Sequence, residues 1–236
     1  MLSGPRAAHL LNVLHVSPGH QVRVGVLDGA RGTATVQSIG DGTVALRCVL
    51  EPEIPARPAV DLLLAVPRPK VMRRLWAQIA ALGVGRIILT NAEKVERNYF
   101  DAHVLSPDTY RPLLIEGLQQ ARDTRVPVVS IHRQFRPLVE NQLDLLFGAG
   151  LRVVADPSAT SPVSDVVRTS NEERLLLAIG PEGGWNAFEL GLLSAHGFQP
   201  AGMGARTLRT DTACVALLAL AHGAREISDF RGQISD

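Results

Sequence analysis

The feature that most constrains the fold is a regular alternation of short apolar segments and amphipathic segments after residue 59. Apolar runs typical of buried strands occur at Val60–Val66, Arg86–Thr90, Val126–Ile131, Leu151–Ala155 and Leu175–Ile179. Segments with helical spacing of apolar residues occur at Lys70–Leu82, Pro107–Arg122, Asn186–His196 and Thr210–His222. Alternation on this scale predicts an α/β fold, with a mostly parallel sheet covered by helices on both faces.

The first 57 residues follow a different pattern and predict a small β domain. Three β-branched runs, each bounded by glycine-containing hairpin signals, occur at Gln21–Leu27, Thr33–Ile39 and Thr43–Leu50. A segment with helical spacing, Ala7–Val16, precedes them. The proline-rich residues 51–58 are the best candidate for a linker. We therefore predict two domains, residues 1–57 and residues 58–236.

Composition indicates a soluble globular protein. Hydrophobic residues make up 46% of the 236 residues and charged residues 20%. No apolar run approaches the roughly 18 residues of a membrane span, and the first ten residues lack the apolar core of a secretory signal. Cys48 and Cys214 lie far apart without metal-ligand spacing, which is typical of reduced thiols. We expect a cytoplasmic protein with no membrane partner.

One stretch of the predicted sheet has the form of a ligand loop. Residues 175–184 read LLLAIGPEGG, a strand-like run that ends in a glycine-rich turn. Asn186 offers a helix N-cap and Glu189 stands where a capping box needs its acid, while Trp185 and Leu190 hold the positions of a hydrophobic staple. In an open α/β sheet, ligands bind at the carboxyl ends of strands, and adjacent glycines let a ligand approach the backbone.

A second loop, residues 202–213 (GMGARTLRTDTA), opens the last predicted helix. The pairing of IGPEGG with LRTDTA resembles the SPOUT class of RNA methyltransferases. Within that class it resembles the RsmE family of 16S ribosomal RNA (uracil-N3) methyltransferases. That family usually has Glu where this chain has Asp211. Further similarity lies in residues 9–15 (HLLNVLH), 70–84 (KVMRRLWAQIAALGV) and 116–127 (EGLQQARDTRVP).

The resemblance implies both an architecture and a reaction. It implies a C-terminal SPOUT domain with a trefoil knot and a PUA-like β-barrel at residues 1–57 that binds RNA. The implied cofactor is S-adenosylmethionine, and the implied reaction is direct methyl transfer to uracil N3. The implied partners are ribosomal RNA or the small ribosomal subunit, and a second copy of the chain, since in the family a homodimer completes each active site.

The two loops supply the candidate site residues. Backbone groups of the glycines suit an adenine edge and the apolar side chains suit pocket walls. The cofactor candidates are Leu175, Ile179, Gly180, Pro181, Gly183, Gly184, Met203, Gly204, Leu208, Thr210, Thr212 and Ala213. Arg209 and Glu182 are the catalytic candidates, Arg209 as a stabiliser of negative charge and Glu182 as a proton acceptor or orienting group. For Glu182, a solvated turn acid is the alternative interpretation. The substrate-binding candidates are Gln120, Arg125 and Arg206.

Other ligand motifs are missing from the sequence. A dinucleotide loop requires Gly-x-Gly-x-x-Gly after the first strand, whereas Gly202-Met203-Gly204 is followed by Thr207 and lies near the C-terminus. No phosphate-loop motif, no His/Cys cluster with metal spacing and no Gly-x-Ser-x-Gly elbow occurs, so we expect no metal site. Two alternatives stay open: a SPOUT enzyme acting on another RNA base, and a non-catalytic RNA-binding protein of the same fold.

Overall fold

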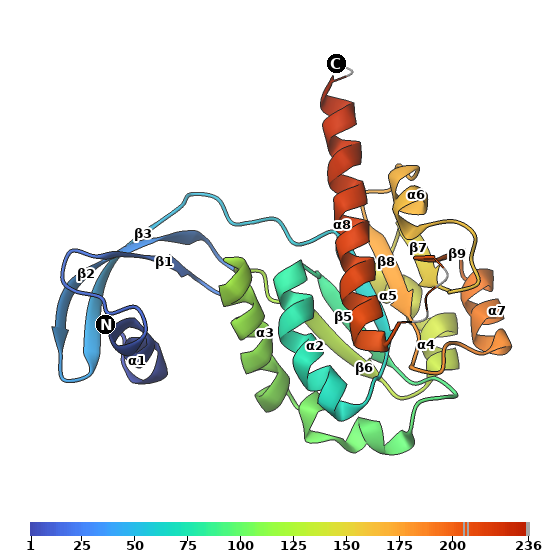
Figure 1. The fold of residues 1–236 in the computed structure, drawn as a ribbon, viewed down its shortest axis with the longest axis horizontal. Coiled ribbons are helices and arrows are strands. Elements are labelled where there is room, and N and C mark those ends of the chain that lie inside the picture. Colours follow the sequence, from blue (N-terminus) through green and yellow to red (C-terminus); the bar gives the residue numbers. More distant parts are fainter. Residues whose placement is uncertain (205, 207, 235–236) are drawn as a thin grey trace. The chain divides into compact units, whose positions relative to one another are not determined.

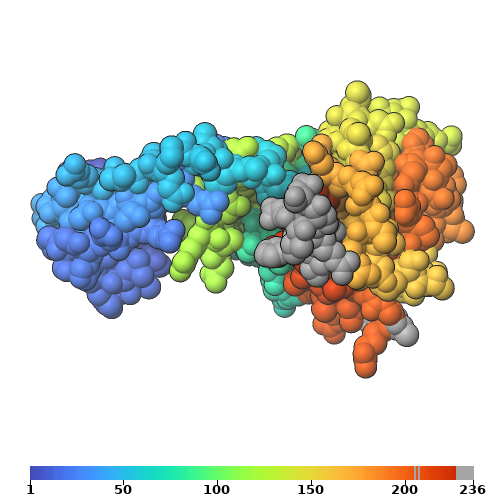
Figure 2. All heavy atoms as spheres, turned by 90° about the horizontal axis from the view of Figure 1, so that it is seen from above, coloured from blue at the N-terminus to red at the C-terminus, as the bar shows by residue number. Residues whose placement is uncertain are grey.

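The computed structural model describes residues 1–204, 206 and 208–234, with side chains of the last helix described as far as Glu226. The chain forms two compact units. The first contains residues 1–56 together with residues 122–125, and the second contains the remainder of the chain. In the space-filling view, the early residues in shades of blue gather into a body of their own (Figure 2).

The first unit is a three-stranded antiparallel sheet with one helix. Helix α1 (Gly4–Asn12) precedes strands β1 (Gln21–Gly25), β2 (Arg31–Gly40) and β3 (Thr43–Leu50), which pair in the order β1-β2-β3. Its small core consists of Ala7, Leu10, Val36 and Val44. The predicted antiparallel strands are therefore confirmed, whereas the PUA-like barrel stays a prediction.

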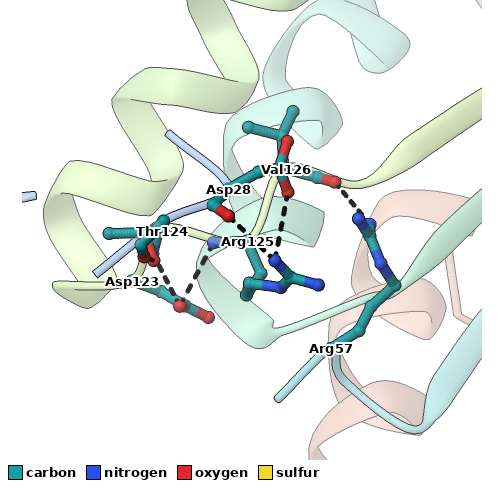
Figure 3. A network of polar contacts seen from close by, with 7 residues as sticks. Asp28, Arg57, Asp123, Thr124, Arg125 and Val126 are labelled. Atoms are coloured by element: carbon teal, nitrogen blue, oxygen red, sulfur yellow. Dashed lines mark hydrogen bonds and ion pairs between the residues drawn. The ribbon is translucent and has the colours of Figure 1, made fainter. Parts of the chain in front are cut away.

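A short segment from much later in the chain completes this unit (Figure 3). The amide of Asp28 donates to the Thr124 carbonyl at 2.7 Å, and the Thr124 hydroxyl donates to the Gly29 carbonyl at 2.6 Å. A Cβ at Gly25 would lie 2.5 Å from the Thr124 methyl group, so this close approach requires glycine. The hairpin turn between β1 and β2 is thus bound by residues 122–125.

The second unit contains a six-stranded, wholly parallel sheet. Its strands are β4 (Val60–Ala65), β5 (Arg86–Thr90), β6 (Val128–His132), β7 (Leu151–Ala155), β8 (Leu175–Ile179) and β9 (Phe198–Ala201), in the order β6-β5-β4-β8-β7-β9. All residues of β4 and β8 are buried, because helices cover both faces. The predicted α/β fold is confirmed. Strand β9 was not predicted, since its sequence FQPA is too short and polar to suggest a strand.

The helices of this unit form two layers (Figure 1). Helices α2 (Pro69–Leu82) and α8 (Thr210–Ile234) lie on the nearer face in Figure 1, while α4 (Phe135–Asn141) and α5 (Leu143–Phe147) lie behind the sheet. The remaining helices are α3 (Pro107–Ala121), α6 (Val163–Arg168), α7 (Ala187–Ala195) and the 3₁₀ helices η1 (Arg97–Asp101) and η2 (His103–Leu105). Among the described residues, none of the helices has the length and apolar character that crossing a bilayer requires.

Candidate functional site

A pocket of about 260 Å³ opens at the carboxyl ends of β7, β8 and β9. Three loops build it: the segment after β7, the glycine loop (residues 180–184) after β8, and the segment between β9 and α8. Their lining residues are Ala155, Asp156, Pro157, Ile179, Gly180, Pro181, Glu182, Gly183, Gly184, Trp185, Leu190, Ala201, Gly202, Met203, Gly204, Arg206, Leu208, Thr210, Ala213 and Leu217. The pocket therefore stands where ligands bind in parallel α/β sheets.

Local sequence explains how the glycine loop turns into α7. The amide of Gly184 donates to the Pro181 carbonyl at 2.8 Å and closes a turn, and Gly184 has a φ of +70°, which favours glycine. The predicted capping box is confirmed. The Asn186 side chain accepts from the Glu189 amide at 2.8 Å, and the Glu189 carboxylate accepts from the Asn186 amide at 2.7 Å.

Two polar contacts hold the glycine loop to the segments that follow β4 and β5. The Glu182 carboxylate accepts a hydrogen bond from the backbone amide of Arg68 at 3.3 Å, at the N-cap of α2. The ammonium group of Lys94 donates to the Gly183 carbonyl at 2.6 Å. A Cβ at Gly183 would lie 2.6 Å from Cδ of Lys94. The lysine side chain therefore packs directly against this glycine.

Gly202, directly after β9, is packed closely against the backbone of another segment. A Cβ at Gly202 would lie 3.1 Å from the carbonyl oxygens of Asp156 and Ala159. The Gly202 amide donates to the Ser161 carbonyl at 2.9 Å, and its own carbonyl accepts from the Val163 amide at 2.9 Å. The segment after β7 is thus packed directly against the start of the second loop.

Most of the predicted site residues come together in this pocket. Ten of the twelve cofactor candidates line it, as do Glu182 and Arg206; the ten are Ile179, Gly180, Pro181, Gly183, Gly184, Met203, Gly204, Leu208, Thr210 and Ala213. Leu175 begins β8, four residues and roughly 13 Å from Ile179 at the carboxyl end. Thr212 is exposed in the first turn of α8 and is not part of the lining.

Three other candidates are placed outside the lining. Arg209 is exposed, between the lining residues Leu208 and Thr210. Gln120 is exposed near the end of α3. Arg125 belongs to the other compact unit, where its guanidinium donates to the Asp28 carbonyl at 3.0 Å (Figure 3).

Sequence reasoning missed the contribution of the segment after β7. Asp156 and Pro157 line the pocket because β7 pairs in parallel with both β8 and β9, so that the three carboxyl ends meet at one edge. The signal was an Asp-Pro turn directly after a predicted strand. Trp185 was expected only as a staple residue, yet it also lines the pocket. It is 8% exposed, and its ring centroid lies 5.3 Å from that of Phe135 on α4.

One ion pair joins the start of α8 to α2. Arg74 on α2 and Asp211 on α8 approach to 2.7 Å, and the hydrogen bond from Arg74 lowers the pKa of the Asp211 carboxyl, against the opposing effect of burial. Asp211 is therefore ionised, and its ion pair with Arg74 links α8 to α2.

The cysteine nearest to this region is not a plausible nucleophile. Burial raises the pKa of the Cys214 thiol to about 12, so the reactive thiolate is scarcely populated at neutral pH. In the described part of the chain, no group of three His, Cys, Asp or Glu side chains is arranged to hold a metal ion.

Comparison with known proteins identifies the fold and the family. Residues 55–222 match the family model of the RNA methyltransferase domain. The ribosomal RNA small subunit methyltransferase E of Treponema pallidum is 32% identical over 92% of this chain and 84% of its own length. The ribosomal RNA small subunit methyltransferase E 1 of Borreliella burgdorferi is 23% identical over 91% of this chain and 88% of its own length.

A solved structure shows the same fold. The ribosomal RNA small subunit methyltransferase E of Neisseria gonorrhoeae, determined bound to S-adenosyl methionine, superposes with a TM-score of 0.73. The match covers 92% of this chain and 88% of that one, at 21% identity. The family-model match spans well over half of the chain. The match to the Treponema pallidum relative covers 92% of the chain. The chain belongs to the ribosomal RNA small subunit methyltransferase E family.

Proposed function

We propose that this protein uses S-adenosylmethionine to methylate N3 of a uracil in 16S ribosomal RNA. The observation that carries the proposal is the pocket at the carboxyl ends of β7, β8 and β9, in which the two motif loops meet. The family match supports the reaction class, and the names of the relatives support ribosomal RNA as the substrate.

The residues of the pocket fit the proposed cofactor. The glycine loop brings backbone without side chains to the pocket, and Ile179, Leu208 and Leu217 supply apolar walls. Asp156 and Glu182 add two carboxylates, which suit a ligand that carries positive charge and hydroxyl donors. When bound, S-adenosylmethionine supplies an electrophilic methyl group on a positively charged sulfur.

The cations at the mouth of the pocket fit RNA. Arg206 lines the pocket, Arg209 is exposed between two lining residues, and Arg68 is exposed where its backbone contacts Glu182. Guanidinium groups bind phosphate oxygens and planar carbonyl groups through paired donors. We place Arg209 against the uracil oxygens that flank N3, where charge accumulates when the N3 proton leaves, and Arg68 and Arg206 against the RNA backbone.

Glu182 is the candidate acceptor for the N3 proton. One of its carboxylate oxygens accepts the amide of Arg68, which orients the group while leaving lone pairs for a second partner. The deprotonated N3 then bonds to the methyl carbon as the carbon–sulfur bond breaks, and the electron pair of that bond stays on sulfur. The chain's main contribution is alignment of the reacting atoms, an effect worth roughly 7–11 kcal/mol in well-oriented reactions.

The architecture implied by the resemblance supports this proposal. We infer a trefoil knot in which the segment through Gly202 passes the loop of residues 156–162, with the hydrogen bonds of Gly202 to Ser161 and Val163 as supporting contacts. We assign residues 1–57 to RNA binding as a PUA-like barrel and residues 58–236 to methyl transfer. A cytoplasmic location follows from the proposed substrate.

The test is methyl transfer from labelled S-adenosylmethionine to unmodified small-subunit RNA, both free and assembled in the small ribosomal subunit. We expect one labelled nucleoside, identified by mass spectrometry as N3-methyluridine. Label on a different base would favour a SPOUT enzyme of other specificity. RNA binding without label transfer, at saturating cofactor, would favour a non-catalytic binding protein.

A further inference from the structure

We propose that Lys94 is a positioning residue for the cofactor: its ammonium group holds the Gly183 carbonyl and so keeps the glycine loop in its binding shape. This inference rests on the proposed cofactor site. Lys94 is not among the lining residues of the pocket, so it acts through Gly183. The chain contains only one other lysine, Lys70, which lies in the first turn of α2.

The geometry of the contact is specific. The Lys94 nitrogen lies 2.6 Å from the Gly183 carbonyl oxygen, a short distance that is typical of a charge-assisted hydrogen bond. The aliphatic stem of Lys94 passes over the face of Gly183 from which a side chain would project, since a Cβ there would lie 2.6 Å from Cδ of Lys94. The lysine therefore covers this glycine and binds its carbonyl with the same side chain.

The base from which Lys94 reaches the loop is itself held in place. The amide of the preceding residue, Glu93, donates to the Glu189 carboxylate at 2.7 Å, and that carboxylate also caps α7. The following residue, Val95, is buried in the core and its amide donates to the Ala92 carbonyl at 3.0 Å. The backbone around Lys94 is thus held by hydrogen bonds and core packing, and its side chain extends from there to the glycine loop.

The loop needs such a contact because of its composition. The peptide between Gly183 and Gly184 has glycine on both sides, so its rotation meets few steric barriers. Its two groups are fixed by different partners: the Gly183 carbonyl by Lys94, and the Gly184 amide by the Pro181 carbonyl. Without Lys94, the second bond is the only hydrogen bond from the described residues that still holds this peptide. Binding of a ligand would then have to order the loop, and affinity falls when ordering accompanies binding.

The experiment compares cofactor affinity and kinetics in matched variants. Lys94→Met keeps most of the stem but removes the donor, Lys94→Arg keeps a donor, and Lys70→Met removes one positive charge elsewhere. We expect Lys94→Met to weaken S-adenosylmethionine binding by about tenfold in calorimetry and to raise the KM for the cofactor similarly. At saturating cofactor, kcat and the KM for RNA should change less than twofold. Lys94→Arg should restore at least half of the loss in binding free energy, and Lys70→Met should bind the cofactor as the wild type does.

A second set of variants checks the route through Gly183. A methyl group in Gly183→Ala would displace the flexible Lys94 stem, so this variant should weaken cofactor binding by a similar factor. The double variant Gly183→Ala/Lys94→Met should then bind no more than twofold more weakly than either single variant, which is the signature of one shared interaction. If Lys94→Met alone proves poorly folded, Lys94→Arg and Gly183→Ala still test the contact, and unchanged cofactor affinity in Gly183→Ala would then overturn the role of Lys94.

The outcomes separate this inference from the proposed function. Wild-type protein that does not bind S-adenosylmethionine at all would overturn the proposed function, and the inference with it. Wild-type binding with unchanged affinity in Lys94→Met, or with an equal loss in Lys70→Met, would overturn the role of Lys94 alone. So would fully additive effects in the double variant, or a lower kcat at unchanged cofactor affinity.

Discussion

Arg209 occupies the single position between two residues that line the pocket, Leu208 and Thr210. Its side chain is exposed, and its backbone carbonyl accepts the Ala213 amide at 2.8 Å in the first turn of α8. The Arg209 carbonyl is thus bonded within the helix, so the exposed guanidinium is the group of this residue that can contact a substrate. An arginine does not serve as a base at neutral pH, so the role we propose for Arg209 is to bind and stabilise negative charge.

We predict that Arg209→Ala lowers turnover by about 10²–10³-fold, the effect of losing one preorganised donor. S-adenosylmethionine affinity should move little, because the backbone around the pocket is unchanged. Arg209→Lys should rescue poorly, since a point charge cannot reproduce two parallel donors. Single-turnover kinetics and calorimetry measure the two quantities separately. Lost cofactor binding with preserved turnover at saturation would contradict this assignment.

Between elements, the packing of α8 against α2 includes a partly buried histidine. His222 on α8 lies beside Gly83, the left-handed C-cap residue of α2. Burial lowers the pKa of His222, and this effect exceeds the opposing influence of a hydrogen bond with the Gly83 backbone and of the Glu226 carboxylate. Burial also lowers the pKa of His132, at the end of β6. The folded protein therefore favours both imidazoles in their neutral form.

The sign of the pH dependence follows from proton binding. Below the ordinary value of 6.5, the unfolded chain takes up protons on these histidines that the folded chain does not. The free energy of unfolding should therefore fall as pH decreases from about 6.5, by at most about 1.4 kcal/mol per pH unit for each histidine. His222→Gln should make this slope shallower while leaving a constant difference from wild type above about pH 7.5. Urea unfolding at a series of pH values measures the slope, and an unchanged slope would contradict the prediction.

For the whole molecule, we expect a homodimer, as the family resemblance implies. A hollow between α6 and α8 is lined by Ser164 and Arg168 of α6 and by Ala219, Leu220, Gly223 and Ala224 of α8. Leu220 is 41% exposed, so this apolar side chain of α8 is available for contact with a second copy of the chain. Light scattering at micromolar concentration should give twice the mass of the chain. A monomer that retains full methyl-transfer activity would rule out the dimer as a requirement.

Much of the fold follows from local pattern in the sequence. The apolar runs of β7 and β8 match the predicted bounds, since a strand buried on both faces needs continuous apolar residues. The turn at residues 180–184 and the capping box of Asn186 and Glu189 are equally local, because each depends on residues within a few positions of one another. Short elements such as α5 and β9 contain too few residues for a period to be recognised, so they were not predicted.

The sequence by itself determined the two motif loops of the candidate site, the strand–turn–helix geometry of the first loop and the helix that follows the second. Only the tertiary structure decided which distant residues complete that site. Asp156 reaches the pocket through the pairing of β7 between β8 and β9, and Lys94 reaches Gly183 across 89 positions of the chain. Arg125, whose role in substrate binding stays a prediction, donates to the Asp28 carbonyl of the hairpin turn between β1 and β2. Local signals depend on neighbours in the chain, whereas these contacts depend on strand order, and strand order is set by packing of the whole sheet.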